Sequence, residues 1–186
     1  MRKLIEYTLA SVDGVCTGPE LTRFFQYRDD AYFRDGLGQL VACDAMLMGR
    51  TTYEAFAKIW PGSSHPWAER INSMAKYVFS STLREAEWAN SVIVRGDVAT
   101  EVSELKRCDG GDLLIYGHGL LARTLLGSRL VDVLDLSVHP VIAGSGGLFF
   151  HEEVRAAMQL VGVKTFSKIV KLTYEPRYAD AATPQG

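Results

Sequence analysis

Residues Met46–Glu54, with the sequence MLMGRTTYE, decide more of the fold of this chain than any other stretch. A short apolar run ends at Gly49, and Thr51 and Glu54 then have the spacing of a capping box. The pattern predicts a strand that turns at a glycine into a helix, with the positive charge of Arg50 at the helix start. Free N–H groups and the helix dipole favour an anion such as phosphate at this corner, and an ordinary strand-to-helix turn is the alternative.

Similar apolar runs, closed by glycine, serine or aspartate, recur on both sides of this corner. We expect strands at residues 3–9, 45–48, 76–79, 91–94, 112–116, 131–138, 159–163 and 168–174. Helical spacing of apolar residues is found at 21–41, 51–59, 98–105 and 120–126. This order predicts a three-layer α/β/α fold with a mostly parallel central sheet and an antiparallel C-terminal edge hairpin. We expect one domain over residues 1–178 and a flexible tail at 179–186.

The overall composition excludes several classes of protein. A chain of 186 residues with 47% hydrophobic content can bury a substantial core. A net charge of −2 and a pI near 6.1 give no general attraction to nucleic acid or to anionic membranes. No apolar run approaches the ~20 residues that span a bilayer. The three separated cysteines predict a reducing cytoplasm, and the four histidines lack metal-ligand spacing, so no metal site is expected.

Three of the predicted strands end in corners that suit phosphate groups. The corners are Gly49-Arg50-Thr51-Thr52, Ser80-Ser81-Thr82 and Gly117-His118-Gly119-Leu120. In an open parallel sheet, ligands bind beyond the carboxyl ends of the strands, so the three corners should share one edge. Together they predict a long anionic ligand such as a dinucleotide, held by one guanidinium, several hydroxyls and backbone amides.

The third corner also fits the dinucleotide-binding pattern G-x-G-x-x-A over Gly117–Ala122. However, this match follows four other predicted strands, and no acidic residue ends the next strand to bind a ribose. Asp132 lies at the beginning of that strand instead. A standard Rossmann domain is therefore rejected, and the prediction retains only a glycine turn beneath a pyrophosphate.

The order of these motifs resembles the dihydrofolate reductase family, and more closely the wider family that includes the reductase domain of bacterial riboflavin biosynthesis. The similar segments are GRTTYE at 49–54, VFSST at 78–82, IYGHGLL at 115–121, ASVDG at 10–14 and HPVIAGSGGLF at 139–149. The resemblance covers about residues 2 to 175. It implies a stand-alone, NADPH-dependent reductase that transfers hydride to a small pteridine- or pyrimidine-like heterocycle, and a homodimer formed at the edge of the sheet.

The resemblance also implies where the cofactor binds. Its phosphates would be held by Gly49, Arg50, Thr51 and Thr52, and its adenosine ribose and 2′-phosphate by Ser80, Ser81 and Thr82. The pyrophosphate would lie over Gly117, Gly119, Leu120 and Leu121, and the nicotinamide beside Ala10, Val12, Asp13 and Gly14. Asp13 is the candidate catalytic residue, because it could position a substrate amine or a water that carries a proton. Aspartate before glycine is also ordinary turn chemistry.

The acceptor site is less well defined by the sequence. Dihydrofolate reductase carries an acid on its first helix, but none of Glu20, Asp29, Asp30 and Asp35 lies in a matching motif here, and Asp29 and Asp30 are expected on the solvated face. One alternative is the riboflavin-pathway reductase of a phosphoribosylaminopyrimidine, which would need Arg23, Arg28 or Arg34 for the substrate phosphate. Another is a nucleotide-binding protein without turnover. The aromatic residues Tyr53, Phe56, Trp60 and Trp67 suit either a flat-ring pocket or the core.

Two further predictions concern histidines. His118 is expected to face solvent from its glycine turn. His139 shares one face of a strand with Asp135 and Ser137, but residues spaced in this way along a strand do not form a catalytic relay by themselves. A polar sheet face or a subunit contact is the preferred interpretation.

Overall fold

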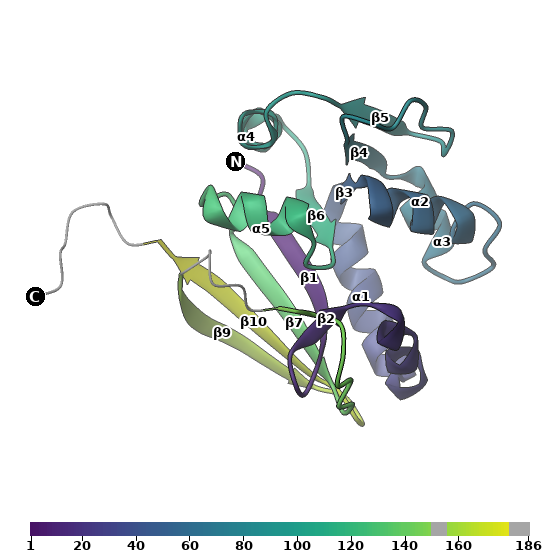
Figure 1. Cartoon of the computed structure of the whole chain (residues 1–186), viewed down its shortest axis with the longest axis vertical. Coiled ribbons are helices and arrows are strands. Elements are labelled where there is room, and N and C mark those ends of the chain that lie inside the picture. The colour runs from purple at the N-terminus through teal and green to yellow at the C-terminus, as the bar shows by residue number, and fades with distance from the viewer. Residues whose placement is uncertain (150–155, 179–186) are drawn as a thin grey trace, which may run out of the picture.

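The computed structural model describes residues 1–149 and 156–178, and its main feature is an eight-stranded sheet within these ranges (Figure 1). In spatial order the strands are β5 (Ser91–Val94), β4 (Ala75–Phe79), β3 (Cys43–Gly49), β6 (Asp112–Tyr116), β1 (Leu4–Ser11), β7 (Val133–His139), β10 (Val170–Arg177) and β9 (Ala157–Thr165). Neighbours from β5 to β7 are parallel, whereas β10 is antiparallel to both β7 and β9. The mostly parallel sheet with an antiparallel C-terminal hairpin is therefore confirmed. The predicted tail at 179–186 lies outside the described residues.

Helices cover both faces of this sheet (Figure 1). One face carries α1 (Asp30–Ala42), α2 (Arg50–Ile59) and α3 (Ala68–Ser73), and the other carries α4 (Val98–Arg107) and α5 (Leu120–Gly127). Side chains alternate along a strand, so Met46 and Met48 of β3 enter the first core while Ala45 and Leu47 enter the second. Full burial of a methionine or leucine side chain such as these contributes about 1.5–3 kcal/mol. The three-layer α/β/α arrangement is as predicted.

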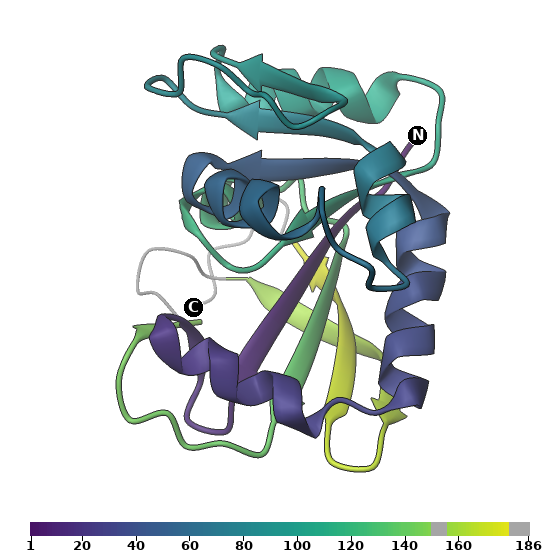
Figure 2. The same cartoon turned by 90° about the vertical axis from the view of Figure 1, so that its right-hand side faces the viewer.

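Two short elements near the N-terminus complete the described structure. The 3-10 helix η1 (Pro19–Tyr27) lies across the ends of β1 and β7 (Figure 2), and Phe24 of η1 stacks on His139 of β7 at 4.8 Å between ring centroids. Strand β2 (Val15–Thr17) pairs with β8 (Gly147–Leu148) in a separate small sheet. No helix among the described residues is long and apolar enough to cross a membrane.

The predicted helix over residues 21–41 is in fact two helices, η1 and α1. Asp29 separates them, because its side chain accepts a hydrogen bond from the Tyr32 amide and caps α1. Asp29 was expected on the solvated face; it is partly exposed, and its carboxylate serves as the cap of α1. Gly36 inside α1 is explained by close packing, since an added Cβ would lie 2.5 Å from the Trp67 ring. The short helix α3 was not predicted.

Candidate functional site

The candidate site lies at the point in the sheet where the helices that follow neighbouring strands switch from one face to the other. Strands β3 and β6 are neighbours, yet α2 and α5, the helices that follow them, lie on opposite faces (Figure 1). Ligands of open parallel sheets bind beyond the carboxyl ends of the strands at such a switch point. A cavity of about 340 Å³ is found here, between the first turns of the two helices.

Most of the residues predicted to bind phosphate line this cavity. The lining includes Gly49, Arg50, Thr51 and Thr52 from the β3 corner, and Gly117, Gly119, Leu120 and Leu121 from the β6 corner. Ser80, Ser81 and Thr82 do not line it, although Phe79 just before them does. Residues 10–14, predicted beside the nicotinamide, form the end of β1 and the turn after it, and they also lie outside the lining.

The two helices that begin at the cavity have no side-chain cap. Gly49 is the N-cap of α2 and Gly119 that of α5, and neither position supplies a side-chain hydrogen bond. Helices α1 and α4 are different, since Asp29 and Asp97 accept hydrogen bonds from their first turns. The first-turn amides of α2 and α5 are therefore free of a competing carboxylate at the cavity, as an anion site requires.

The predicted capping box of Thr51 and Glu54 is wrong. Gly49, with extended backbone angles, is the N-cap, two residues before Thr51, so α2 begins at Arg50 and Thr51 lies inside its first turn. Glu54 accepts a hydrogen bond from Arg50 Nε at 2.7 Å, and Arg50 Nη1 donates to Thr82 Oγ1 at 2.9 Å. Arg50 thus links the first and second predicted corners beside the cavity, with 48% of its side chain exposed.

The turn after β6 is held in place by a buried contact between the side chains of His118 and Glu6. His118 is only 6% exposed, so the expected solvent-facing position is wrong. Its Nδ1 lies 2.6 Å from Oε1 of Glu6, which is fully buried and also accepts a hydrogen bond from Thr8 Oγ1 at 3.0 Å. Gly117 has φ of +84°, which favours glycine. Glu6 was not predicted, and the available signal was a lone acidic residue inside an otherwise buried strand.

Asp13, in the turn after β1, is hydrogen-bonded to the glycine-rich loop that follows β7. Its carboxylate accepts hydrogen bonds from the amides of Ala143 at 2.9 Å and Gly144 at 2.8 Å. A hydrogen bond from the Ser11 side chain, together with those two amides, lowers the pKa of Asp13 to about 2. Asp13 is therefore ionised at neutral pH, and both of its oxygens already accept hydrogen bonds. This arrangement fixes the loop over residues 10–14 against the glycine-rich loop.

A closed circle of aromatic side chains lies on the sheet face that carries α1 and α2. Successive ring centroids are 4.9–6.3 Å apart, and the circle closes through a hydrogen bond between two tyrosine hydroxyls. We call it the aromatic circle, and its members are Tyr7, Tyr32, Phe33, Phe56, Trp60, His65 and Tyr116. Tyr116 also lines the 340 Å³ cavity, so the two features share this residue. Of the predicted pocket aromatics, Phe56 and Trp60 belong to the circle, whereas Tyr53 and Trp67 are buried in the core.

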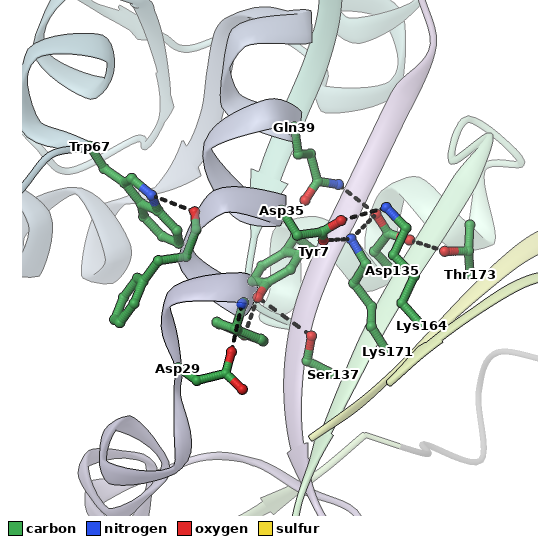
Figure 3. Close-up of polar contacts among 12 residues, drawn as sticks. Tyr7, Asp29, Asp35, Gln39, Trp67, Asp135, Ser137, Lys164, Lys171 and Thr173 are labelled. Atoms are coloured by element: carbon green, nitrogen blue, oxygen red, sulfur yellow. Dashed lines mark hydrogen bonds and ion pairs between the residues drawn. The ribbon is translucent and has the colours of Figure 1, made fainter. Parts of the chain in front are cut away.

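The acidic residues near α1 are engaged elsewhere. Asp29 caps α1 and also accepts a hydrogen bond from the Ser167 amide at 2.9 Å. Asp35 pairs with Lys171 and Lys164 of the C-terminal hairpin (Figure 3). Glu20 lies 3.0 Å from Arg23, and Asp30 is exposed. None of these acids lines the 340 Å³ cavity.

The polar residues of β7 have separate partners and form no relay. Asp135 accepts hydrogen bonds from Gln39 at 2.6 Å and Thr173 at 2.5 Å, while Ser137 donates to the Tyr7 hydroxyl at 3.4 Å (Figure 3). His139 is fully buried against Phe24, and burial lowers its pKa to about 4. The preferred interpretation of a polar sheet face is correct, and most of that face packs against α1.

Comparison with known proteins identifies the family. Residues 2–172 match the model of the RibD C-terminal domain, and the chain belongs to this family. An uncharacterised protein of Bacillus subtilis, YyaP, is 32% identical over 152 residues, which cover 78% of this chain and 79% of YyaP. Uncharacterised YwjB of the same organism is 26% identical over 179 residues, covering 93% of this chain and 97% of YwjB.

Solved structures agree on the fold. A putative riboflavin biosynthesis protein from Shewanella has a TM-score of 0.72 at 19% identity, and the match covers 95% of this chain and 99% of that one. A deaminase/5-amino-6-(5-phosphoribosylamino)uracil reductase from Thermotoga maritima has a TM-score of 0.66 at 15% identity, but this chain spans only 57% of its length. The dihydrofolate reductase-like fold predicted from the motifs is thereby confirmed.

Proposed function

We propose that this protein is an NADPH-dependent reductase that binds its cofactor in the 340 Å³ cavity. One observation carries the proposal: two uncapped helix N-termini meet at the switch point of the sheet, with Arg50 beside them. Amides and a guanidinium arranged in this way suit the phosphates of a dinucleotide. Membership of the RibD C-terminal domain family supports a redox role for the site.

A preference for NADPH over NADH follows from the charges beyond β4 and β5. Arg95 donates hydrogen bonds to the carbonyl oxygens of Ser81 at 3.2 Å and Leu83 at 2.8 Å. Together with Arg50, which donates to Thr82, it places two guanidinium groups around the Ser80–Thr82 turn. Two fixed positive charges beside the predicted ribose site would favour the 2′-phosphate that distinguishes NADP from NAD.

When bound, NADPH supplies a hydride, and the protein orients the acceptor and excludes water. The aromatic circle adjoins the cavity through Tyr116 and offers flat apolar surfaces for a heterocyclic ring. Asp13 remains the predicted catalytic residue for the nicotinamide end. In the proposed mechanism it acts as an ionised carboxylate that holds the loop over residues 10–14 in place.

Titration with NADPH and NADH, followed by protein fluorescence and calorimetry, tests the proposal. We expect NADPH to bind at least tenfold more tightly than NADH. Arg50→Ala should weaken NADPH binding by about 1–3 kcal/mol, because a charge-assisted phosphate contact is lost. Arg34→Ala, at an exposed position of α1, is the matched control and should leave the affinity unchanged. Absence of NADPH binding by the wild-type protein would reject the proposal.

Turnover assays separate the remaining candidates. Oxidation of NADPH with dihydrofolate would indicate a pteridine reductase, and oxidation with 5-amino-6-(5-phosphoribosylamino)uracil would indicate the riboflavin-pathway reaction that the Thermotoga protein's name describes. Tight NADPH binding without oxidation by any heterocycle would favour a nucleotide-binding protein.

The edge strand β9 supports the proposed homodimer. Leu160, Val161 and Val163 of this strand are 49%, 47% and 55% exposed. An exposed apolar edge strand tends to pair with another chain, and a two-fold contact closes it. Replacing Val161 and Val163 together by lysine should give a monomer in analytical ultracentrifugation, whereas Lys164→Glu at the same edge should not.

A further inference from the structure

Arg28 lies beside the aromatic circle, in the segment between η1 and α1, and it is half-buried. Its guanidinium carbon lies 4.4 Å from the centroid of Phe25 and 5.4 Å from that of Tyr32. Burial lowers the pKa of His65 and raises that of Tyr116, and the positive charge of Arg28 adds to the first shift and opposes the second. Tyr32, His65 and Tyr116 belong to different parts of the circle, so the charge of Arg28 acts on several of its members.

Arg28 has no anionic partner among the described residues. Its Nε is buried and donates no hydrogen bond, and no carboxylate there lies within ion-pair distance of it. Cation–π contacts hold the guanidinium against Phe25 and Tyr32, but they supply no acceptor for the buried Nε–H. Trp60 Nε1, in the same circle, is a second buried donor without an acceptor. Two unused donors, one of them charged, indicate that a ligand supplies the acceptors.

The other arginines considered for the substrate do not meet these conditions. Arg23 is paired with Glu20, and 62% of its side chain is exposed. Arg34 is exposed on α1. Arg50 donates to Glu54 and Thr82 at the cofactor cavity.

We propose that Arg28 selects a hydride acceptor whose negative charge lies on the heterocyclic ring itself, such as a ring carboxylate. This inference rests on the proposed function, because the circle adjoins the cofactor cavity. A flat ring within the circle would stack on the aromatic side chains, and a carboxylate on that ring would receive the forked hydrogen bonds of the guanidinium.

Orotate and uracil are suitable probes, since they share one ring and differ in a single carboxylate. Their binding is measured by tryptophan fluorescence and calorimetry, with and without saturating NADP⁺. We expect orotate to bind about tenfold more tightly than uracil to the wild-type protein. Arg28→Gln should reduce orotate affinity about tenfold and leave uracil affinity within twofold, so that the preference disappears. Arg34→Gln removes the same charge from an exposed position and should preserve the preference.

Circular dichroism melts of each variant exclude unfolding as the cause. Equal affinities of the wild-type protein for the two probes, a preference that survives Arg28→Gln, or no binding of either probe would each overturn the inference. NADPH affinity is measured in parallel and should be unchanged in Arg28→Gln. Failure of the wild-type protein to bind NADPH would reject the reductase function, while an orotate preference that depends on Arg28 would still establish the anion-selective site.

Discussion

Two regions of the molecule use polar groups in opposite ways: the cavity at the ends of β3 and β6 (the cavity side) and the surroundings of α1 (the α1 side). At the cavity, α2 and α5 begin without side-chain caps. At α1, Asp29 caps the helix, and Asp35 pairs with two lysines of the C-terminal hairpin (Figure 3). The cavity side leaves donors available to a ligand, whereas Asp29 and Asp35 on the α1 side have partners within the protein. Substitutions at the cavity should therefore change affinity, and substitutions at α1 should change stability.

The largest expected effect is on the α1 side. Asp35→Ala leaves the ammonium of Lys171, only 5% exposed, with Asp135 at 3.8 Å as its remaining partner. We expect the free energy of unfolding to fall by about 2–3 kcal/mol in urea titrations, with NADPH affinity unchanged. Lys164→Ala removes the 60% exposed partner of Asp35 and should cost less than about 1 kcal/mol. Replacing the buried pair by Asp35→Leu with Lys171→Met should restore most of the stability. A large loss of NADPH affinity in Asp35→Ala would contradict the comparison.

The next effect is on the cavity side. Gly49→Asp would give α2 the cap that α1 and α4 have, and the added Cβ meets no atom within 4 Å. The new carboxylate should compete with phosphate for the amides and repel it, which would weaken NADPH binding by about 2 kcal/mol in calorimetry. Stability should be unchanged or slightly higher. Gly49→Ser caps without charge and should have a smaller effect. Unchanged affinity in Gly49→Asp would show that the α2 terminus does not contact the cofactor.

His139 provides a smaller, pH-dependent test of the α1 side. Burial lowers its folded pKa from 6.5 to about 4, so the unfolded chain binds a proton first as the pH falls. The stabilisation is complete above pH 6.5 and is lost progressively between pH 6.5 and 4, by about 1 kcal/mol at pH 5.5. His139→Phe keeps an aromatic ring against Phe24, and its unfolding free energy should vary less with pH in this range. An identical pH dependence in the two proteins would mean that His139 is not responsible.

The smallest effect concerns the cap of α1. Asp29→Ala removes the hydrogen bonds to the amides of Tyr32 and Ser167. We expect the thermal midpoint to fall by about 2–4 °C and the NADPH affinity to stay within twofold. Asp97→Ala at α4 is the matched comparison and should behave similarly. If either variant bound NADPH much more weakly, the division between the two regions would be incorrect.

The cavity side was predictable because its signals are local. Strand ends, glycine corners and the charge of Arg50 lie within a few residues of one another, and both lining corners were found from them. The exact first residue of α2 was not predictable, since an extended Gly49 can precede a helix without a capping box. The buried position of His118 depends on Glu6, 112 residues away, so no local pattern reveals it.

The α1 side was not predictable because its partners are distant in the sequence. Asp35 and Lys171 are separated by 136 residues. Besides α1, the aromatic circle takes its members from β1, α2, β6 and the loop after α2. Residue types alone therefore could not show that Phe56 belongs to the circle and Tyr53 does not. The sequence could name Arg28 as a candidate, but only its surroundings separate it from Arg23 and Arg34.

The place of β1 in the middle of the sheet has a consequence for how the protein folds. Leu4 pairs with Leu113, and Ile5 with Val133, so β1 is enclosed only after β6 and β7, more than 100 residues further along the chain, have been synthesised. Such distant pairing slows folding and leaves apolar surface open during synthesis. We therefore expect nascent chains to depend on chaperones until β7 leaves the ribosome.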